Sequence, residues 1–257
     1  MPTSPLFRTS LVVAVVALAS LTLELVMTRL FSVVFYYHFT FLTLSVAFIG
    51  ASSAGIVAWL LGERLRRPEA DAWYAPLLGV TGLSMFGILG VLKSAAFYRA
   101  LLSGEVLQLI PALGLITVPF FLVSLILCIA FTRNASRIGM IYGIDLVAAA
   151  LGCFLYPLVI RSAGGAGSAF VCGTLCVLAM LFAPWRPGEI STRRRALGWS
   201  LRVGAVAVAL GLLGWQLTTG AWEIRPRVHR DVIGEGGQIE RRWNSVSSLA
   251  VDRKSVV

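Results

Sequence analysis

Two acidic residues, Glu24 and Asp145, lie inside long apolar stretches and have the chemistry to bind a charged ligand. Ionisable side chains within a membrane helix cost free energy, so they normally face the interior of a helix bundle or a water-filled cavity. A carboxylate in such surroundings attracts cations, and the low dielectric strengthens this attraction. One interpretation of the two residues is therefore a site for a proton, a small cation or a polyamine.

Asp145 belongs to a stripe of residues at spacings of three and four, which share one face of a helix. The members of this stripe are Tyr142, Asp145, Ala149, Gly152 and Tyr156. Gly139 and Gly143 form a small-xxx-small pair on a neighbouring face, a pattern that permits close helix packing. A second interpretation is that Asp145 makes an interhelical hydrogen bond or pairs with an arginine. We favour this structural role, because one buried acid is enough to tie helices together.

Glu24 precedes Arg29 by five residues, and two threonines lie nearby. The Arg29 side chain is long enough to reach the membrane interface while Glu24 points inward. Contact of Glu24 with a substrate or a cation is one interpretation. The interpretation that we favour is an ion pair between the two residues, which would orient the end of the first apolar stretch.

The remaining polar residues give no pattern typical of catalysis or metal binding. His38 follows two tyrosines at the start of an apolar stretch, so we interpret it as an interfacial residue. The other histidine, His229, lies far along the chain, and no second metal ligand has a suitable spacing. The four cysteines lie within apolar stretches and predict small buried thiols. Without a nucleotide-binding loop, a Gly-x-Ser-x-Gly elbow or a paired-carboxylate site, we expect no catalytic residue, metal or cofactor.

The composition is typical of a membrane protein. Of 257 residues, 58% are hydrophobic and 13% charged, whereas a soluble domain has about 45–50% apolar and about 25% charged residues. This excludes a disordered chain, a small disulfide scaffold and an ordinary soluble enzyme. The net charge of +10 would suggest a nucleic-acid partner in a soluble protein. Here most of it lies in short segments between apolar runs, where it sets membrane topology, so we expect the lipid bilayer and not nucleic acid as partner.

Seven apolar runs have about the 20 residues that a helix needs to cross the hydrocarbon core. They cover residues 10–27, 39–61, 74–92, 109–131, 138–160, 166–183 and 201–217. Helices are expected because the bilayer offers no water to satisfy backbone groups. We therefore predict an all-α polytopic transmembrane bundle of about seven spans over residues 1–217, followed by a short polar tail at 218–257. Small-xxx-small pairs at Gly50/Ala54 and Ala51/Gly55 predict close helix approach in the second run.

The distribution of arginine and lysine predicts the orientation of this bundle in the cell membrane. The N-terminus and the second, fourth and sixth loops carry ten positive residues: Arg8, Arg64, Arg66, Arg67, Arg133, Arg137, Arg186, Arg193, Arg194 and Arg195. The opposite loops carry Arg29, Lys93, Arg99 and Arg161. Positive loops favour the cytoplasm, which places the N-terminus there. Seven spans then put the tail outside, although its seven positive residues favour the inside. Either one run does not span, or the tail is external.

The composition changes in the tail. Residues 222–257 are polar and basic, and Gln238 to Asp252 has the pattern of a hairpin or an edge strand. Two interpretations stay open, namely the beginning of a folded domain and a disordered basic tail.

Four stretches carry a resemblance to a known family. They are Glu24–Arg29 leading into Tyr36–Phe39, the small residues of Gly50–Gly55, Phe131–Arg133 followed by Tyr142–Gly152, and Glu240–Ser245. Together they resemble the N-terminal membrane region of spermidine synthase-like (polyamine aminopropyltransferase-like) integral membrane proteins. The most specific parts are Tyr-x-x-Asp-Leu at 142–146 and Trp-Asn-Ser at 243–245. Val246 and Ser248 stand where such proteins would have Phe and Arg.

The resemblance implies a membrane module that anchors or scaffolds a soluble synthase-like domain as its partner. That domain would be Rossmann-like, with a glycine loop and catalytic acids beyond Val257, and none of its motifs stands in this sequence. We therefore do not expect the chain to catalyse aminopropyl transfer on its own. The alternative function is a transporter or channel for a small cation or polyamine that uses Glu24 and Asp145.

Overall fold

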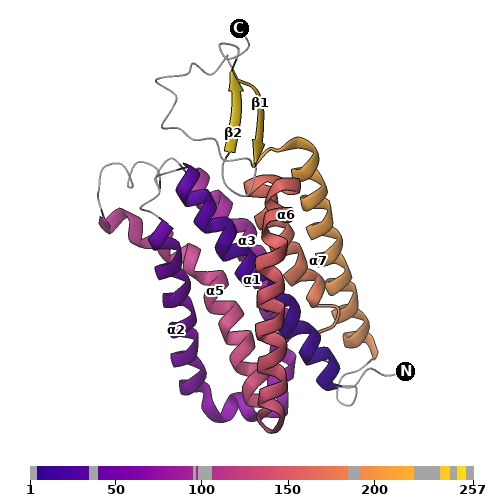
Figure 1. Cartoon of the computed structure of the whole chain (residues 1–257). Helices are drawn as coiled ribbons and strands as arrows, with labels where there is room; N and C mark the ends of the chain where they lie inside the picture. The colour runs from indigo at the N-terminus through magenta and orange to yellow at the C-terminus, as the bar shows by residue number, and fades with distance from the viewer. Residues whose placement is uncertain are drawn as a thin grey trace.

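The computed structural model describes residues 5–34, 40–94, 97, 106–184, 192–222, 238–243 and 248–252. Six helices in these ranges are long and apolar enough to cross a membrane, which indicates a multi-pass membrane protein. They are α1 (Pro5–Val34), α2 (Thr40–Arg66), α3 (Tyr74–Lys93), α5 (Val106–Arg133), α6 (Ile138–Ala179) and α7 (Thr192–Thr219). Short 3-10 helices, η2 (Pro68–Trp73) and η3 (Ala135–Arg137), precede α3 and α6. The predicted helix bundle is confirmed (Figure 1).

Helix α6 is too long for a single crossing. Its 42 residues correspond to about 63 Å, roughly twice the hydrocarbon thickness of about 30 Å. The helix is broken at Gly164, where φ is 74° and ψ is 178°, a conformation that suits glycine because it has no Cβ. We call residues 138–163 the first arm and residues 165–179 the second arm. Because α6 contains both the fifth and the sixth predicted span, the count of seven stays a prediction.

The chain turns back at this break. Met180, just after α6, packs beside Gly79 near the start of α3, and its carbonyl accepts a hydrogen bond from Arg202 of α7 at 3.1 Å. Phe170 stacks instead on Phe86, late in α3, with ring centroids 4.9 Å apart. The second arm therefore runs antiparallel to α3, and both ends of α6 lie at the end of the bundle where α3 begins.

Helix α1 packs along α6 and also contacts α2 and α5, while α3 lies against α5 and α6 and α7 covers α6. Glycines permit the closest approaches, as the pair Gly50/Ala54 predicted. A Cβ on Gly50 would lie 2.8 Å from the backbone nitrogen of Phe121 in α5. The expected packing role of Gly55, Gly139 and Gly143 is wrong, because a Cβ on any of them would meet open space. At these positions, α2 and α6 contact their neighbours through faces other than the one that carries the glycine.

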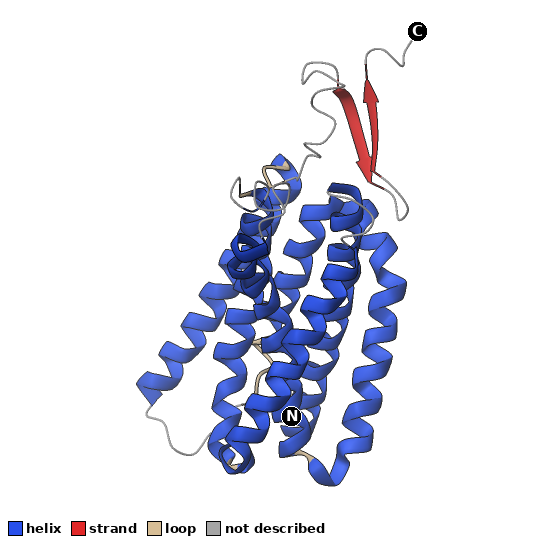
Figure 2. Ribbon diagram, turned by 90° about the vertical axis from the view of Figure 1, so that its left-hand side faces the viewer, coloured by secondary structure: helices blue, strands red, loops and turns tan. Residues whose placement is uncertain are grey.

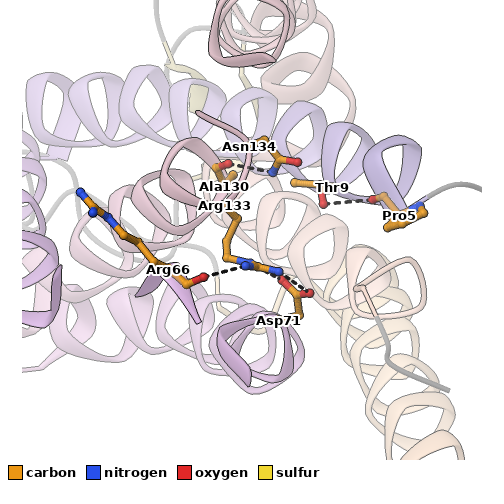
Figure 3. Close-up of polar contacts among 7 residues, drawn as sticks. All are labelled: Pro5, Thr9, Arg66, Asp71, Ala130, Arg133 and Asn134. Atoms are coloured by element: carbon orange, nitrogen blue, oxygen red, sulfur yellow. Dashed lines mark hydrogen bonds and ion pairs between the residues drawn. The ribbon is translucent and has the colours of Figure 1, made fainter. Parts of the chain in front are cut away.

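An arginine joins three elements at the end of the bundle where α3 begins (Figure 3). Arg133, the last residue of α5, donates hydrogen bonds to both carboxylate oxygens of Asp71 in η2, at 3.0 and 3.2 Å. It also donates to the carbonyl oxygen of Arg66, the last residue of α2, at 2.8 Å. This cluster fixes the short connection between α2 and α3 against α5.

The tail contains the predicted hairpin. Strand β1 (Gln238–Trp243) pairs antiparallel with β2 (Ser248–Asp252), with Arg241 opposite Ala250 and a register shift between Gln238 and Glu240. Figures 1 and 2 both place this hairpin at the end of the bundle away from the start of α1.

Candidate functional site

Glu24 and Asp145, which belong to different helices, share a cavity in the structure. Both residues line one cavity of about 220 Å³, to which α1, α2, α5 and α6 contribute. The hydroxyl-bearing residues Ser20 and Ser124 line it as well, and the remaining lining residues are apolar. We call this cavity the acidic groove.

The helical repeat explains which side chains reach the acidic groove. On α1, Ser20 and Glu24 are one turn apart, and on α6, Asp145 and Ala149 have the same spacing. The predicted stripe on α6 therefore faces α1 over at least part of its length.

Gly152 sets the distance between α1 and the first arm of α6. A Cβ there would lie 2.8 Å from the carbonyl oxygen of Leu18, and the Thr22 hydroxyl donates a hydrogen bond to the Gly152 carbonyl at 3.3 Å. Because α1 and the first arm of α6 begin at the same end of the bundle (Figure 1), Asp145, two turns before this contact, lies toward that end of the groove. Glu24, which follows Thr22, lies toward the other end.

Neither carboxylate has a partner among the described residues. Within the described ranges, Glu24 and Asp145 are half-buried and their carboxylates form no ion pair and no hydrogen bond. Among these residues, Asp145 shows no interhelical hydrogen bond or arginine pair of the expected kind, and Glu24 and Arg29 show no ion pair. Five residues along a helix correspond to a rotation of about 140°, which turns the side chain of Arg29 away from Glu24.

The other predicted site residues lie outside the acidic groove. Tyr142 is 51% exposed and makes an edge-to-face contact with Phe131, with centroids 6.2 Å apart. The Nε of Arg29 is buried without a hydrogen-bond partner among the described residues, away from the cavity lining. His38 lies outside the described residues.

The predicted buried thiols are found at two of the four cysteines. Cys172 and Cys176 are fully buried in the second arm of α6, Cys128 is partly buried and Cys153 is exposed. Cys153 directly follows Gly152, so it points away from α1.

The groove offers oxygen atoms and no nitrogen ligand. The described residues contain no group of three or more His, Cys, Asp or Glu able to hold a metal ion. Two carboxylates and two hydroxyls instead suit a cation that donates hydrogen bonds, such as an ammonium group with its three N–H donors. Ser124 could not be predicted, because it belongs to no motif and reaches the groove only through the packing of α5.

No protein-family model matches the chain, and neither the curated proteins nor the solved structures gave a match. The resemblance to spermidine synthase-like proteins therefore stays a prediction that depends on the four sequence stretches alone.

Proposed function

We propose that this protein binds a small organic cation, such as a polyamine or another amine, in the acidic groove of a multi-pass bundle in the cell membrane. One observation carries the proposal: two carboxylates from different helices line the same cavity, and neither has a partner in the part of the chain that the structure describes. An unpaired acid at bilayer depth is costly, and a bound ammonium group would offset that cost. Binding at this site would be the first step of transport.

Asp145→Asn is expected to weaken amine binding by about tenfold to a hundredfold, the effect of losing a hydrogen bond between charged groups. The measurement is equilibrium binding of radiolabelled 1,4-diaminobutane to the full chain in lipid nanodiscs, and its flux into vesicles. Glu24→Gln should have a similar effect. Both changes keep the side-chain volume and remove no protein contact, so the melting temperature should stay the same.

Glu63→Gln is the matched control, because Glu63 is an exposed carboxylate outside the groove with only a surface contact to Arg66. It should leave binding unchanged. Equal binding by wild type and Asp145→Asn, or no binding by either, would refute the proposal.

We also propose seven crossings with the N-terminus in the cytoplasm. The two arms of α6 run in opposite directions, and Lys93 at the end of α3 donates a hydrogen bond to the carbonyl of Ala221 just after α7, at 2.8 Å. Because α1 starts at the other end, this supports a tail on the opposite side from the N-terminus. The arginine-rich loops favour the cytoplasm for the end with Arg8, Arg66 and Arg133.

A reporter enzyme that is active only outside the cytoplasm tests this topology. Fused at Val257 it should be active, and fused after Arg67 it should be inactive. An inactive fusion at Val257, with the protein present at normal levels, would leave an even number of crossings.

A second function is compatible with the first, namely a membrane anchor for a synthase-like domain. The hairpin at 238–252 favours it, because it includes the Trp243 position of the family-like stretch and projects beyond the bundle (Figure 2). Sequencing the genomic DNA after the Val257 codon is the test. A continuing frame with a glycine loop would support the anchor, whereas a stop codon would refute it.

A further inference from the structure

The acidic groove opens to the side of the bundle. Helices α2 and α6 form its two walls but make no extended contact with each other, and α1 and α5 lie between them (Figure 1). Phe48 of α2 lines the groove and is 68% exposed, and Leu146, which follows Asp145 in α6, is 51% exposed. The opening therefore has the surface of a lipid-facing wall.

The opening lies at the depth of the acyl chains. Asp145 stands seven residues after the start of α6 and Phe48 eight residues after the start of α2, which places them roughly 10 and 12 Å along their helices. These two helices start at opposite ends of the bundle. Both residues are thus inside a hydrocarbon core of about 30 Å, with Phe48 nearer the end where α2 begins and Asp145 nearer the end where α6 begins.

The cavity is too small for a whole drug-sized ligand. Its volume of about 220 Å³ is below the range of about 300–1,000 Å³ that encloses such molecules. It accommodates an ammonium head group and a few carbon atoms. The rest of a longer ligand has to leave through the opening, where it meets lipid and the exposed apolar walls.

We infer that the groove takes an amphiphilic primary amine from the bilayer, with the ammonium group inside the acidic groove and the alkyl chain extending between α2 and α6. This inference rests on the proposed function and specifies its ligand class and its route. Charge complementarity selects the head group, and the lateral opening selects the chain. A short amine that enters from water has the same head group, but it has no long alkyl chain to bind the apolar walls.

Photolabelling of the full chain in nanodiscs tests the inference. The probe is dodecylamine with a diazirine on its alkyl chain, competed by unlabelled dodecylamine, by 1,4-diaminobutane and by dodecanol, which partitions into lipid without a charge. We expect labelled peptides from α2 around Phe48 and from α6 around Leu146. Dodecylamine should compete at least about tenfold better than diaminobutane, and dodecanol should not compete.

The variants separate this inference from the proposed function. Asp145→Asn should reduce labelling about tenfold or more, and Glu63→Gln should not change it. If diaminobutane competes as well as dodecylamine, and Asp145→Asn abolishes the competition by both amines, the lateral route is wrong. The cation site would then remain supported. If neither Asp145→Asn nor Glu24→Gln changes the labelling, both the lateral route and the proposed cation site are wrong.

Discussion

Replacing Gly82 with leucine is expected to disrupt the contact between α3 and the second arm of α6 and to lower the stability by about 3 kcal/mol. A Cβ at position 82 would lie 2.5 Å from a methyl group of Val177 and 2.6 Å from the carbonyl oxygen of Gly173. The Gly173 carbonyl belongs to the backbone and cannot move aside as a flexible side chain can. The two helices would therefore have to separate. Thermal unfolding of the purified protein in detergent, followed by circular dichroism, measures the effect.

Gly87→Leu is the control for this prediction. Gly87 belongs to the same helix, and a Cβ there would have no atom within 4 Å. The loss of glycine and the gain of apolar volume are the same in both variants, so the difference between their melting temperatures isolates the close approach. Equal melting temperatures would show that α3 and α6 are not packed at Gly82.

Removing the Arg133 guanidinium is the second large expected effect, at about 2 kcal/mol for Arg133→Gln. The Arg133–Asp71 pair is bidentate, and the two side chains are only 21% and 22% exposed. Breaking a buried pair costs about 3–5 kcal/mol, and partial solvent access reduces this figure. The variant also loses the bond to the Arg66 carbonyl, so the end of α2 should loosen. Chemical denaturation in detergent measures the change.

A double-mutant cycle with Asp71→Asn tests the pair itself. The coupling energy should be about 1 kcal/mol or more, since the two groups are in direct contact. Glu63→Gln, which removes an exposed pair with side chains 83% and 71% exposed, should cost less than about 0.5 kcal/mol. A coupling energy near zero would mean that Arg133 acts through its bond to the Arg66 carbonyl alone.

Patterns within single segments were sufficient to predict the helices, and in the tail they indicated a hairpin or an edge strand without excluding a disordered segment. The apolar runs are continuous, and the segment from Gln238 to Asp252 has strand composition. Contacts between segments could not be predicted from patterns within one segment. Gly139 and Gly143 have the same spacing as Gly50 and Ala54, yet only the latter pair meets a neighbouring helix.

The acidic groove illustrates the same limit of sequence patterns. Glu24 and Asp145 stood out because charge is rare inside apolar runs. Their place in one cavity, however, depends on the packing of α6 against α1, as at Gly152, which joins residues more than a hundred positions apart in the sequence. In the described residues neither acid has a protein partner. For Glu24, the rotation of about 140° over five helical residues explains why it does not pair with Arg29.

The second arm of α6 is enclosed by its neighbours. Of its 15 residues, 12 are buried and none is fully exposed. Its length of about 23 Å is less than the thickness of the hydrocarbon core. Because it is buried, however, it has little contact with acyl chains. Hydrophobic mismatch should therefore act on the outer helices, which adjust by tilting, so that changes in bilayer thickness are absorbed around this central segment.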